Sequence, residues 1–483
     1  MTTKFIFFFT LTILILSGTI SKAQVNLLDT SFVIGTGFND DVRTIITQVD
    51  GKILVGGKFT NYNGVQQNYI SRLNTDGSLD TSFNIGTGFS YIISTIVLQS
   101  DGKILVGGTF TSYNGINRNA VVRLNTDGSL DTSFINEVTG LLNTINSIAI
   151  QSDGKILIGG NFQMRNGTSQ KRIARLNIDG SWDTTFVGDF SQGSISSIAI
   201  QPDGKILAGG DLIRYINLAT TSSLPVSSLV RLNTDGSIDP SFEIKDGFSG
   251  TIGVSFETVV IQPDGKILVG GEFYTKLYNG AIARLNPDGS LDIPFMMKTS
   301  GPSVFYGSGG YHPIIKSIAL QPDGKILVGG RYLKNSPILR LNPDGGIQSY
   351  IQTGPPGNPF NDIFPDYYMN KIALQSDGKI LVGGKFNSYN LQPRNNILRL
   401  INTTLSVEDS KNKNIRMYPN PAKNAINFSK EISYAEIYSL DGRKVMSNIK
   451  GNSADVSKLE RGTYIIKGID KEGQSFSQKL IKQ

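Results

Sequence analysis

The sequence predicts an all-β protein, a seven-bladed β-propeller of four-stranded antiparallel blades followed by a small C-terminal β-sandwich, and three observations support this prediction. The first is internal repetition, because the string Asp-Gly-Lys-Ile-Leu occurs seven times at intervals of 50 to 61 residues. The second is the strand-and-turn pattern inside each repeat, and the third is the way the two ends of the repeat region complement each other. The seven copies begin at Asp50, Asp101, Asp153, Asp203, Asp264, Asp323 and Asp377.

Each repeat has the pattern of four strands. In the fourth copy, residues 197–201 form a first apolar strand, and a turn containing Asp203-Gly204 leads into a second strand over residues 205–210. A longer loop reaches a third strand that ends at Asn233, and the turn at Asp235-Gly236 directs the chain into a fourth. Asp-Gly between apolar runs favours a hairpin because glycine adopts positive φ at no steric cost. Four antiparallel strands in about fifty residues are typical of a propeller blade rather than of a solenoid coil.

The ends of the repeat region predict that the blades close into a ring. The last repeat stops at Arg399-Leu400-Ile401-Asn402 without a fourth strand, whereas a lone segment with fourth-strand sequence, Leu28-Asp29-Thr30-Ser31-Phe32, stands near the N-terminus. We therefore expect the N-terminal segment to complete the last blade, which leaves no blade edge unpaired. The sixth repeat has a degenerate fourth segment over residues 346–350.

The repeat unit, Asp-Gly-Lys-Ile-Leu…Gly-Gly…Arg-Leu-Asn-x-Asp-Gly-Ser-Leu-Asp-x-x-Phe, resembles the bacterial delta-60 repeat, a family of β-propeller repeats without an assigned activity. The resemblance covers roughly residues 28–402 and recurs seven times. It implies a propeller domain over residues 24–402. Because a fold does not determine a function, the resemblance names no ligand.

Residues 1–23 have the pattern of a secretory signal peptide. Lys4 precedes an almost wholly apolar run over residues 5–20, and Ser21-Lys22-Ala23 predicts cleavage after Ala23. An uncleaved membrane anchor is the alternative, but the run is shorter than the roughly 20 residues that a spanning helix needs. Since no second hydrophobic span follows, we expect no transmembrane segment in the mature chain.

After Asn402 a polar linker over residues 403–414 leads to short alternating strands, with a hairpin turn at Asp441-Gly442, and this pattern predicts a small β-sandwich over residues 415–483. The segment closely resembles the type A C-terminal sorting domain of the type IX secretion system of Bacteroidota. The resemblance implies recognition by an outer-membrane translocon, followed by removal of the domain and release of the protein or its attachment to surface lipopolysaccharide. An ordinary adhesive β-sandwich is the alternative. The motif residues are Tyr418, Pro419, Asn420, Pro421, Asp441, Gly442, Gly462 and Tyr464.

The composition excludes several kinds of site. The chain has no cysteine, which rules out disulfides, a lipobox-type anchor and Cys-based zinc sites, and a single histidine, His312, rules out multi-His metal sites. We expect no cofactor and no metal. The net charge of +7 belongs to the ends of the chain, because residues 411–483 carry 14 Lys and Arg against 7 Asp and Glu. The repeat region is therefore not basic, and nucleic acid is not an expected partner.

Three recurrent motifs are candidate sites that fit a structural role better. Segments such as Asn74–Asp80 have fewer oxygen ligands than a calcium loop and lack its closing Glu, so we interpret them as hairpin turns. The Gly-Gly pairs of the second strands are followed by neither Gly-Lys-Ser/Thr nor a helix, so we do not expect phosphate loops there. The aromatic set Phe59–Gly64 could stack on sugars, but its recurrence with the repeat favours packing inside the blade.

The connections from second to third and from fourth to first strands vary in length, and variable loops on a rigid scaffold tend to carry ligand sites. We expect these loops to share one face of the propeller, although tolerated insertions are an equally good interpretation. The candidate residues of this face are Tyr215, Tyr306, Tyr311, His312, Asp362, Asp366, Tyr367 and Tyr368.

The function that the sequence predicts is a secreted or cell-surface module that binds a protein or a polysaccharide without catalysis, exported via the periplasm through the type IX translocon. An enzyme that acts on extracellular polysaccharides is the first alternative. It would need paired carboxylates roughly 5–9.5 Å apart, and the candidates are Asp362 and Asp366 with Asp211 or Glu272. A purely structural spacer is the second alternative.

Overall fold

A computed structural model of the 483-residue chain divides into two compact units, one spanning Asn26–Asn402 and the other containing the C-terminal segment Thr403–Gln483. Each unit is described by itself. The structure describes residues 27–164, 170–190, 193–211, 214–217, 223–225, 228–244, 254–273, 281–299, 313–331, 338–351, 368–389, 392–401, 417–439, 444–471 and 475–483. The predicted signal peptide and linker lie outside these residues.

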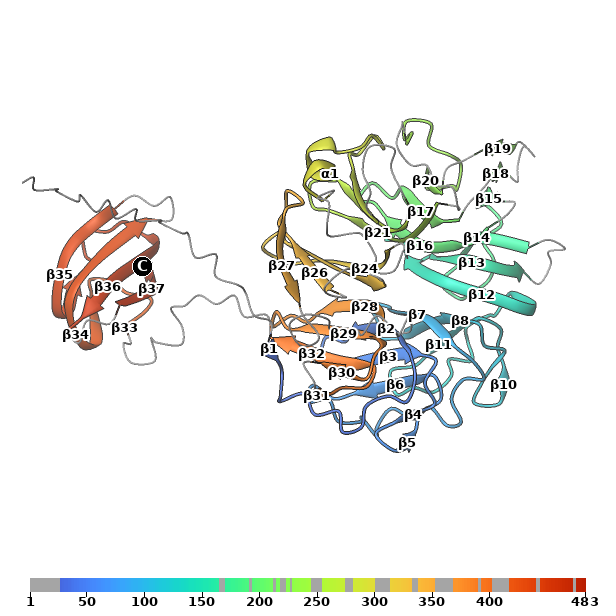
Figure 1. Ribbon diagram of the computed structural model, residues 1–483, viewed down its shortest axis with the longest axis horizontal. Helices are drawn as coiled ribbons and strands as arrows, with labels where there is room; N and C mark the ends of the chain where they lie inside the picture. Colours follow the sequence, from blue (N-terminus) through green and yellow to red (C-terminus); the bar gives the residue numbers. More distant parts are fainter. Residues whose placement is uncertain are drawn as a thin grey trace, which may run out of the picture. The chain divides into compact units, whose positions relative to one another are not determined.

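The larger unit is built from repeated antiparallel sheets (Figure 1). Among the described residues, seven sheets share one plan, in which a first strand pairs with a second and the second pairs with a third. They are β2 (Val42–Thr47), β3 (Ile53–Gly57) and β6 (Ile70–Leu73); β7 (Ile93–Leu98), β8 (Ile104–Gly108) and β11 (Val121–Leu124); β12 (Val138–Ile150), β13 (Ile156–Met164) and β14 (Gln170–Leu176); β16 (Ile195–Ile200), β17 (Ile206–Gly210) and β20 (Leu229–Leu232); β21 (Ser255–Ile261), β22 (Ile267–Glu272) and β23 (Ile282–Leu285); β24 (Ile314–Leu320), β25 (Ile326–Arg331) and β26 (Ile338–Leu341); β28 (Tyr368–Leu374), β29 (Ile380–Lys385) and β32 (Ile397–Ile401).

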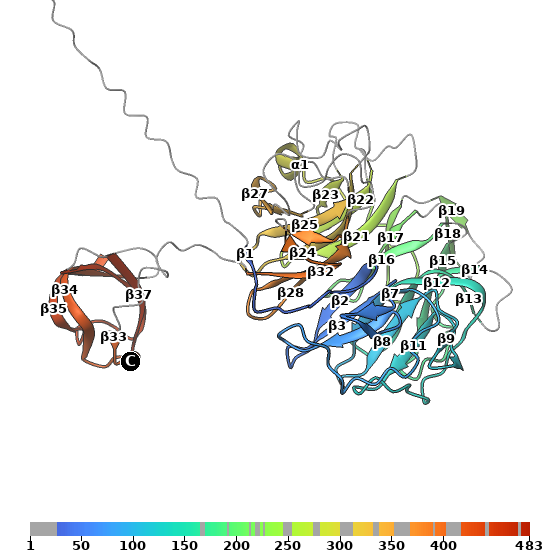
Figure 2. The same ribbon diagram turned by 60° about the horizontal axis from the view of Figure 1, so that its bottom comes forward.

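The first strands of these sheets contact one another in a closed cycle. Strand β2 contacts β7, β7 contacts β12, and the series continues through β16, β21 and β24 to β28, which contacts β2 again. Figures 1 and 2 show these strands innermost, with the third strands farther out. The arrangement is that of a β-propeller, as the repeats predict.

The first glycine of each Gly-Gly pair lets neighbouring sheets pack closely. A Cβ atom on Gly56 would lie 2.7 Å from the Cγ2 atom of Ile93 in the next sheet, and equivalent approaches of 2.5–2.9 Å recur around the ring. In the last sheet, a Cβ atom on Gly383 would lie 2.5 Å from Val42 of the first sheet. The buried branched side chains of one first strand therefore fill the space that glycine leaves in the preceding sheet, and the seventh sheet packs on the first in the same way.

The N-terminal segment completes the last sheet, as predicted. Strand β1 (Leu27–Leu28) pairs antiparallel with β32, with Leu27 opposite Ile401 and Leu28 opposite Leu400. The two ends of the repeat region are thus joined in one four-stranded sheet, in the order β1-β32-β29-β28.

The fourth strand is shorter in five sheets than the sequence pattern indicates. In the first sheet, Leu79 forms a single bridge with Leu73, and Asp80 then accepts hydrogen bonds from the backbone N–H and hydroxyl of Ser82, which turns the chain away. The sixth sheet has Gln348 where the others have this aspartate, and there the chain continues as a full strand, β27 (Ile347–Ile351), paired with β26. The degenerate repeat therefore carries the longest fourth strand among the described residues.

Several short elements decorate the larger unit. A seven-residue helix, α1 (Ile293–Thr299), follows the fifth sheet. Small hairpins join second to third strands: β4 (Asn61–Tyr62) with β5 (Val65–Gln66), β9 (Ser112–Tyr113) with β10 (Ile116–Asn117), and β30 (Ser388–Tyr389) with β31 (Gln392–Pro393). A further small sheet contains β15 (Gly188–Phe190), β18 (Arg214–Asn217) and β19 (Ser223–Pro225).

The C-terminal unit is a five-stranded antiparallel sheet curved around its own core. Its strands are β33 (Met417–Tyr418), β34 (Ala425–Ser439), β35 (Lys444–Asp455), β36 (Gly462–Asp470) and β37 (Ser475–Lys482). Strand β34 has irregular register after Asn427, so its first half pairs with β33 and β35 whereas its second half pairs with β35 and β36. The enclosed core includes Ile426, Ile437 and Ile466. In the described parts of both units, no helix is long and apolar enough to cross a membrane.

Candidate functional site

A β-bulge occurs at the same place in each of the seven first strands. In β2, Val42 pairs with Gly57 and Thr44 pairs with Gly56, so Arg43 between them has no partner in the ladder. The second glycine permits this geometry, because a Cβ atom on Gly57 would lie 2.1 Å from the carbonyl oxygen of Asp41. The seven bulged residues are Arg43, Ser94, Asn146, Ser196, Glu257, Lys316 and Asn370.

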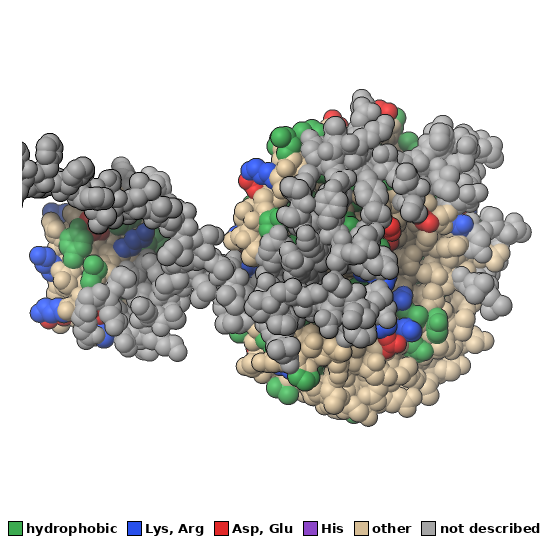
Figure 3. Space-filling view, in the orientation of Figure 1, with side chains coloured by type: hydrophobic (Ala, Val, Ile, Leu, Met, Phe, Trp, Pro, Cys, Tyr) green, Lys and Arg blue, Asp and Glu red, His purple; other side chains and the backbone are tan. Residues whose placement is uncertain are grey.

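All seven bulged residues line one pocket, which we call the axial pocket. It has a volume of about 380 Å³, and Asp41, Arg331 and Tyr368 are the other described residues that line it. Each sheet thus contributes its bulged side chain to a shared cavity at the end of the first strands. In the space-filling view, basic and acidic side chains gather near the middle of the larger unit (Figure 3).

Asp41 is the main hydrogen-bond acceptor of the pocket and joins the last sheet to the first. It accepts from the Asn370 side-chain amide over 2.7 Å, from the Tyr368 hydroxyl over 3.3 Å and from Arg43 Nε over 3.3 Å. Burial raises the pKa of Asp41 above its usual value, and the charge of Arg43 opposes this effect. Burial, with the nearby charge of Asp41, raises the pKa of the Tyr368 hydroxyl to about 12, so this group stays a neutral hydrogen-bond donor.

The charged groups of the axial pocket are unequal in number. Lys316 forms an ion pair of 3.0 Å with Glu257, as Arg43 does with Asp41, and Arg331 lies 5.5 Å from the centre of the Tyr368 ring. Among the lining residues that the structure describes, three cations therefore face two carboxylates. Both carboxylates are engaged by cations, which suits electrostatic binding better than general acid–base chemistry. None of the described residues that line the pocket is aliphatic.

Outside the pocket, the recurrent motifs build a lock between neighbouring sheets. Arg72 donates its Nε–H to Asp80 over 2.6 Å, its guanidinium lies 4.6 Å from the centre of the Phe83 ring, and it also donates to the backbone oxygen of Thr126 in the next sheet. Lys52 of the repeated Asp-Gly-Lys string donates to the same Asp80 carboxylate over 2.9 Å. The same set of contacts recurs for Arg123, Arg175, Arg231, Arg284 and Arg399.

The other repeated motifs are structural, as we interpreted them. Asp76 accepts from the backbone N–H of Ser78 over 2.9 Å across a turn in which Gly77 has a φ of 91°, so this segment is a hairpin turn and not a calcium loop. Tyr62 is 1% exposed and donates its hydroxyl to the backbone oxygen of Gly77 over 2.5 Å. Its ring packs 4.4 Å from that of Phe38, which leaves no face for a sugar.

Comparison with known proteins identifies both parts of the chain. Residues 48–83, 99–134, 151–186, 201–242, 262–292, 321–346 and 375–401 match the domain of unknown function (DUF5122) β-propeller. Residues 416–483 match the secretion system C-terminal sorting domain. The chain is a DUF5122 β-propeller protein with a sorting tail. The delta-60 and type IX resemblances are thereby confirmed, and the tail directs the DUF5122 protein to the cell surface or the extracellular space.

Several solved structures are similar to the DUF5122 protein at low sequence identity. The extracellular domain described as part of a hybrid two component system from B. thetaiotaomicron is 14% identical, covers 95% of this chain and has a TM-score of 0.43; this chain spans 59% of that domain. A gluconolactonase from Xanthomonas campestris is 12% identical, with 78% and 97% of the two chains covered and a TM-score of 0.33. YCF48 from Cyanidioschyzon merolae is 14% identical, with 75% and 96% covered and a TM-score of 0.33. No curated protein matches the chain.

The DUF5122 structure places one of the loop-face candidates in the axial pocket, namely Tyr368. Tyr215 lies on β18, where its backbone pairs with Phe190 and Leu224, and its side chain is not among the described ones. The remaining loop-face candidates lie outside the described residues: Tyr306, Tyr311, His312, Asp362, Asp366 and Tyr367.

The carboxylates of the enzyme alternative are not brought together in the described structure. Asp211 accepts a hydrogen bond from the backbone N–H of Ser194, and Glu272 ends strand β22. Within the described ranges, no cluster of three or more His, Cys, Asp or Glu side chains could hold a metal ion.

The charged residues of the axial pocket were missed by sequence reasoning, which concentrated on long loops. A usable sequence pattern did exist. The position two residues before the invariant branched residue of each first strand carries Arg43, Ser94 and Asn146 in the first three repeats, and it differs again in Glu257 and Lys316. Charged residues of both signs at a position that carries Ser or Asn in other repeats indicate a position that does not serve the repeat.

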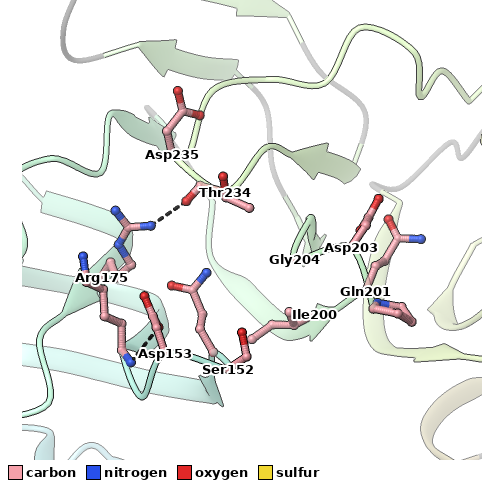
Figure 4. Close-up of a pocket in the computed structure, with 12 residues that line it drawn as sticks. Ser152, Asp153, Arg175, Ile200, Gln201, Asp203, Gly204, Thr234 and Asp235 are labelled. Carbon is pink, nitrogen blue, oxygen red and sulfur yellow. Dashed lines mark hydrogen bonds between the residues drawn. The ribbon is translucent and has the colours of Figure 1, made fainter.

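A second pocket of the DUF5122 propeller, with a volume of about 640 Å³, lies between the turns of the third and fourth sheets (Figure 4). Arg175 points there toward Thr234 and donates to its backbone oxygen, beside the turns at Asp153 and Asp203. Arg175 and the backbone oxygen of Thr234 belong to the repeated lock, and equivalent Arg-to-carbonyl contacts occur between other neighbouring sheets. We therefore assign this pocket to the fold rather than to a specific ligand.

The sorting-domain motif lies where its strands begin and end. Tyr418 ends β33, and the Asn420 side chain accepts a hydrogen bond from the backbone N–H of Ile481 over 2.8 Å. Tyr464 donates its hydroxyl to the backbone oxygen of Glu460 over 2.9 Å, and Gly462 pairs with Lys482 at the end of β37. The predicted hairpin residues Asp441 and Gly442 lie outside the described residues.

Proposed function

We propose that this protein is a non-catalytic binding module of the cell surface or extracellular space, with seven blades, that takes a protein or polysaccharide ligand at the axial pocket. In this proposal, residues 1–23 are the signal peptide, 24–402 the propeller, 403–414 the linker and 415–483 the domain that the type IX translocon recognises. The face that contains the axial pocket is the functional face in this proposal. Of the candidate residues predicted from the sequence, Tyr368 lies there.

One observation carries the proposal. The bulged positions carry five different residue types, with charges of both signs among them, while the Gly-Gly pair opposite them is the same in every repeat, and all seven bulged residues line one cavity. The Gly-Gly pair, which serves the fold, is uniform in this chain, whereas these residues are not. The cavity volume of about 380 Å³ lies within the range of roughly 300–1,000 Å³ that is usual for ligand pockets.

A pocket-filling variant tests the proposal. The purified full chain is applied to a glycan array and used in pull-downs from cell-surface extracts. Ser196 lines the pocket, so Ser196→Tyr should abolish capture of the ligand that the unmodified protein binds. Ser376 lies exposed in the turn at the other end of the seventh sheet, and Ser376→Tyr is the matched control that should bind normally.

Two results would overturn the proposal. Equal capture by Ser196→Tyr and by the unmodified protein would place the ligand elsewhere. Hydrolysis of a polysaccharide by the unmodified protein would make it an enzyme instead of a binding module.

A further inference from the structure

We propose that Tyr69 and Tyr91 form an aromatic subsite beside the axial pocket, where a sugar ring stacks. The ligand is then a polysaccharide chain that occupies the pocket and this subsite together. The inference rests on the proposed function, because it names the ligand class of the same face.

Tyr91 presents an aromatic ring to solvent close to the axial pocket. Its side chain is 50% exposed, and it lies three residues before Ser94, which lines the pocket. Three residues of chain span at most about 11 Å. An oligosaccharide that fills the pocket and extends outward is therefore long enough to reach Tyr91.

Tyr69 of the first sheet holds the Tyr91 ring in place. The two ring centres are 6.1 Å apart and the ring planes are tilted by 51°, an arrangement that aromatic pairs prefer. Tyr69 itself packs against the buried core between the first and second sheets. The loop before Tyr91 is fixed as well, because Phe89 donates its N–H to the backbone oxygen of Asn68, whose side-chain amide donates to the backbone oxygen of Thr87. The subsite is thus preorganised, which reduces the entropy cost of binding.

The backbone of Tyr69 is unusual for a side chain of this size. Its φ is 68°, in the left-handed region that asparagine tolerates better than tyrosine. The equivalent residues of the second and seventh sheets are Ala120 and Asn396, with φ of 57° and 66°. The local fold therefore does not require an aromatic residue here. A large ring in a strained conformation beside a pocket indicates a role in binding.

Tyr91 also departs from the repeat. The position three residues before the bulge holds an aromatic residue in two repeats, as Tyr91 and as Tyr367, and Tyr367 lies outside the described residues. In the other repeats the residues at this position are Asp40, Asn143, Gly193, Val254 and Pro313. Aromatic residues that serve the fold behave differently, since Tyr62, Tyr113 and Tyr389 recur at one position and are buried. The exposed ring of Tyr91 is therefore not part of the repeated packing.

The chemistry beside the Tyr91 ring favours a sugar over a protein. One face of a sugar ring presents C–H groups that pack on the electron-rich face of an aromatic ring, while the hydroxyl groups at its edge need hydrogen-bonding partners. The described lining of the axial pocket offers such partners, among them Ser94, Asn146 and Ser196. The main anchors of protein interfaces instead fill well-packed, fully desolvated pockets. An open aromatic ring next to a hydrogen-bonding pocket suits a polysaccharide chain.

The test is calorimetric titration of the purified full chain with cello-, xylo-, manno- and laminari-oligosaccharides of one to six units. Any glycan that the array captures is titrated in the same way. We expect the association constant of at least one series to rise roughly tenfold between one unit and three, because the longer chain also stacks on Tyr91.

Variants of the two tyrosines locate this gain. Tyr91→Ala should abolish it, whereas Tyr91→Trp keeps an aromatic face and should retain it. Tyr69→Asn should weaken binding of the longer oligosaccharides roughly tenfold, and Asn396 shows that asparagine fits this backbone. The matched control is Tyr434→Ala, at a tyrosine of the C-terminal sheet that is 37% exposed, and it should bind normally. Thermal unfolding shows whether each variant is folded, and if Tyr69→Asn fails to fold, the two Tyr91 variants still decide.

The outcomes separate this inference from the proposed function. Full affinity of Tyr91→Ala for the longer oligosaccharides, or no gain beyond one unit, would overturn the aromatic subsite. If no glycan binds and the pull-down yields a protein that Ser196→Tyr loses, the sugar class is wrong and the binding function stands. If neither the array nor the pull-down yields a pocket-dependent ligand, the proposed function fails as well.

Discussion

Arg399 donates its Nε–H to a carboxylate oxygen of Asp29 over 2.8 Å, although 370 residues separate the two in sequence. Both side chains are 4% exposed. The same arginine donates to the backbone oxygen of Thr75 in the first sheet and lies 4.5 Å from the centre of the Phe32 ring. The lock that joins neighbouring sheets elsewhere is thus reproduced across the point where the chain's repeat region begins and ends.

The first prediction concerns this closing pair. Asp29→Asn should lower the free energy of unfolding by about 3 kcal/mol, because it leaves the Arg399 guanidinium buried without its carboxylate. Urea unfolding is followed by the fluorescence of Trp182, which lies in the third sheet and is the chain's single tryptophan. A shift seen there would show that the closing pair stabilises a distant sheet.

Two comparison variants accompany Asp29→Asn. Asp131→Asn removes the same contact inside one sheet, where Asp131 accepts a hydrogen bond from Arg123 Nε over 2.6 Å. It should lower the free energy of unfolding by a similar amount. Asp153→Asn changes an exposed turn residue and should shift the midpoint little. An unchanged Trp182 transition in Asp29→Asn would contradict the role of ring closure in stability.

The second prediction is that acid destabilises the propeller. Burial alone would raise the pKa of Asp80, but hydrogen bonds from Ser82, Lys52 and Arg72 outweigh it and hold the pKa well below its usual range. The pKa is lowered in the same direction for Asp29, Asp131, Asp183, Asp239 and Asp292.

A carboxyl group whose pKa is lowered by folding contributes stability above its unfolded pKa of about 3.9, and that contribution is lost as the pH falls through the folded pKa. We expect the urea midpoint to be constant between pH 7 and pH 5 and to drop steadily below about pH 4. Asp80→Asn removes one of these groups, so the variant should lose less stability between pH 5 and pH 3 than the unmodified protein. Identical acid slopes for the two proteins would refute this account.

The third prediction concerns the glycine opposite the bulge. Gly271→Ala should destabilise the protein by at least about 3 kcal/mol, because its Cβ atom would lie 2.0 Å from the carbonyl oxygen of Ser255, which is backbone and cannot easily move. Gly346→Ala is the control. Its Cβ atom would come no closer than 3.2 Å to any heavy atom considered, a side-chain oxygen of Asp344. Equal unfolding midpoints for the two variants would argue against glycine as the condition for the bulge.

The fourth prediction concerns export. Deletion of residues 415–483 should leave the protein in the periplasm of its host, detected by fractionation and protease accessibility on whole cells. In the complementary experiment, residues 415–483 are fused to a periplasmic reporter protein, which should then reach the surface or the medium. Normal export of the truncated protein, or retention of the fusion, would show that this segment is not the determinant.

Most of the larger unit's fold could be predicted from the sequence because its determinants recur. Asp-Gly turns, the Gly-Gly pair and the Arg-Leu string each appear in every repeat, and the lone segment at Leu28 pairs where its sequence indicated. The short fourth strands could not be predicted from apolar alternation, since the Asp80 carboxylate ends the strand by capturing the N–H of Ser82. The alternation of apolar and polar residues does not indicate that a side-chain acceptor competes with the strand's backbone hydrogen bonds.

The candidate site was less predictable than the fold. Tyr368, which lines the axial pocket, was among the residues predicted from variable loops, but Arg43 and Lys316 lie inside strands of ordinary appearance. Their side chains share one pocket because of the bulge, which turns one residue of each first strand toward the axis. The bulge itself follows from a close approach between Gly57 and the Asp41 carbonyl, and only coordinates reveal that approach.

The pairing of β1 with β32 also fixes an order of events during synthesis. A ribosome completes the Asp29 codon some 370 residues before Arg399 exists. Until then strand β1 has no partner strand to pair with. The six preceding sheets therefore form an open ring. The ring of sheets can therefore close only when nearly the whole repeat region has been translated. A protein truncated before β32 cannot form the β1–β32 pair.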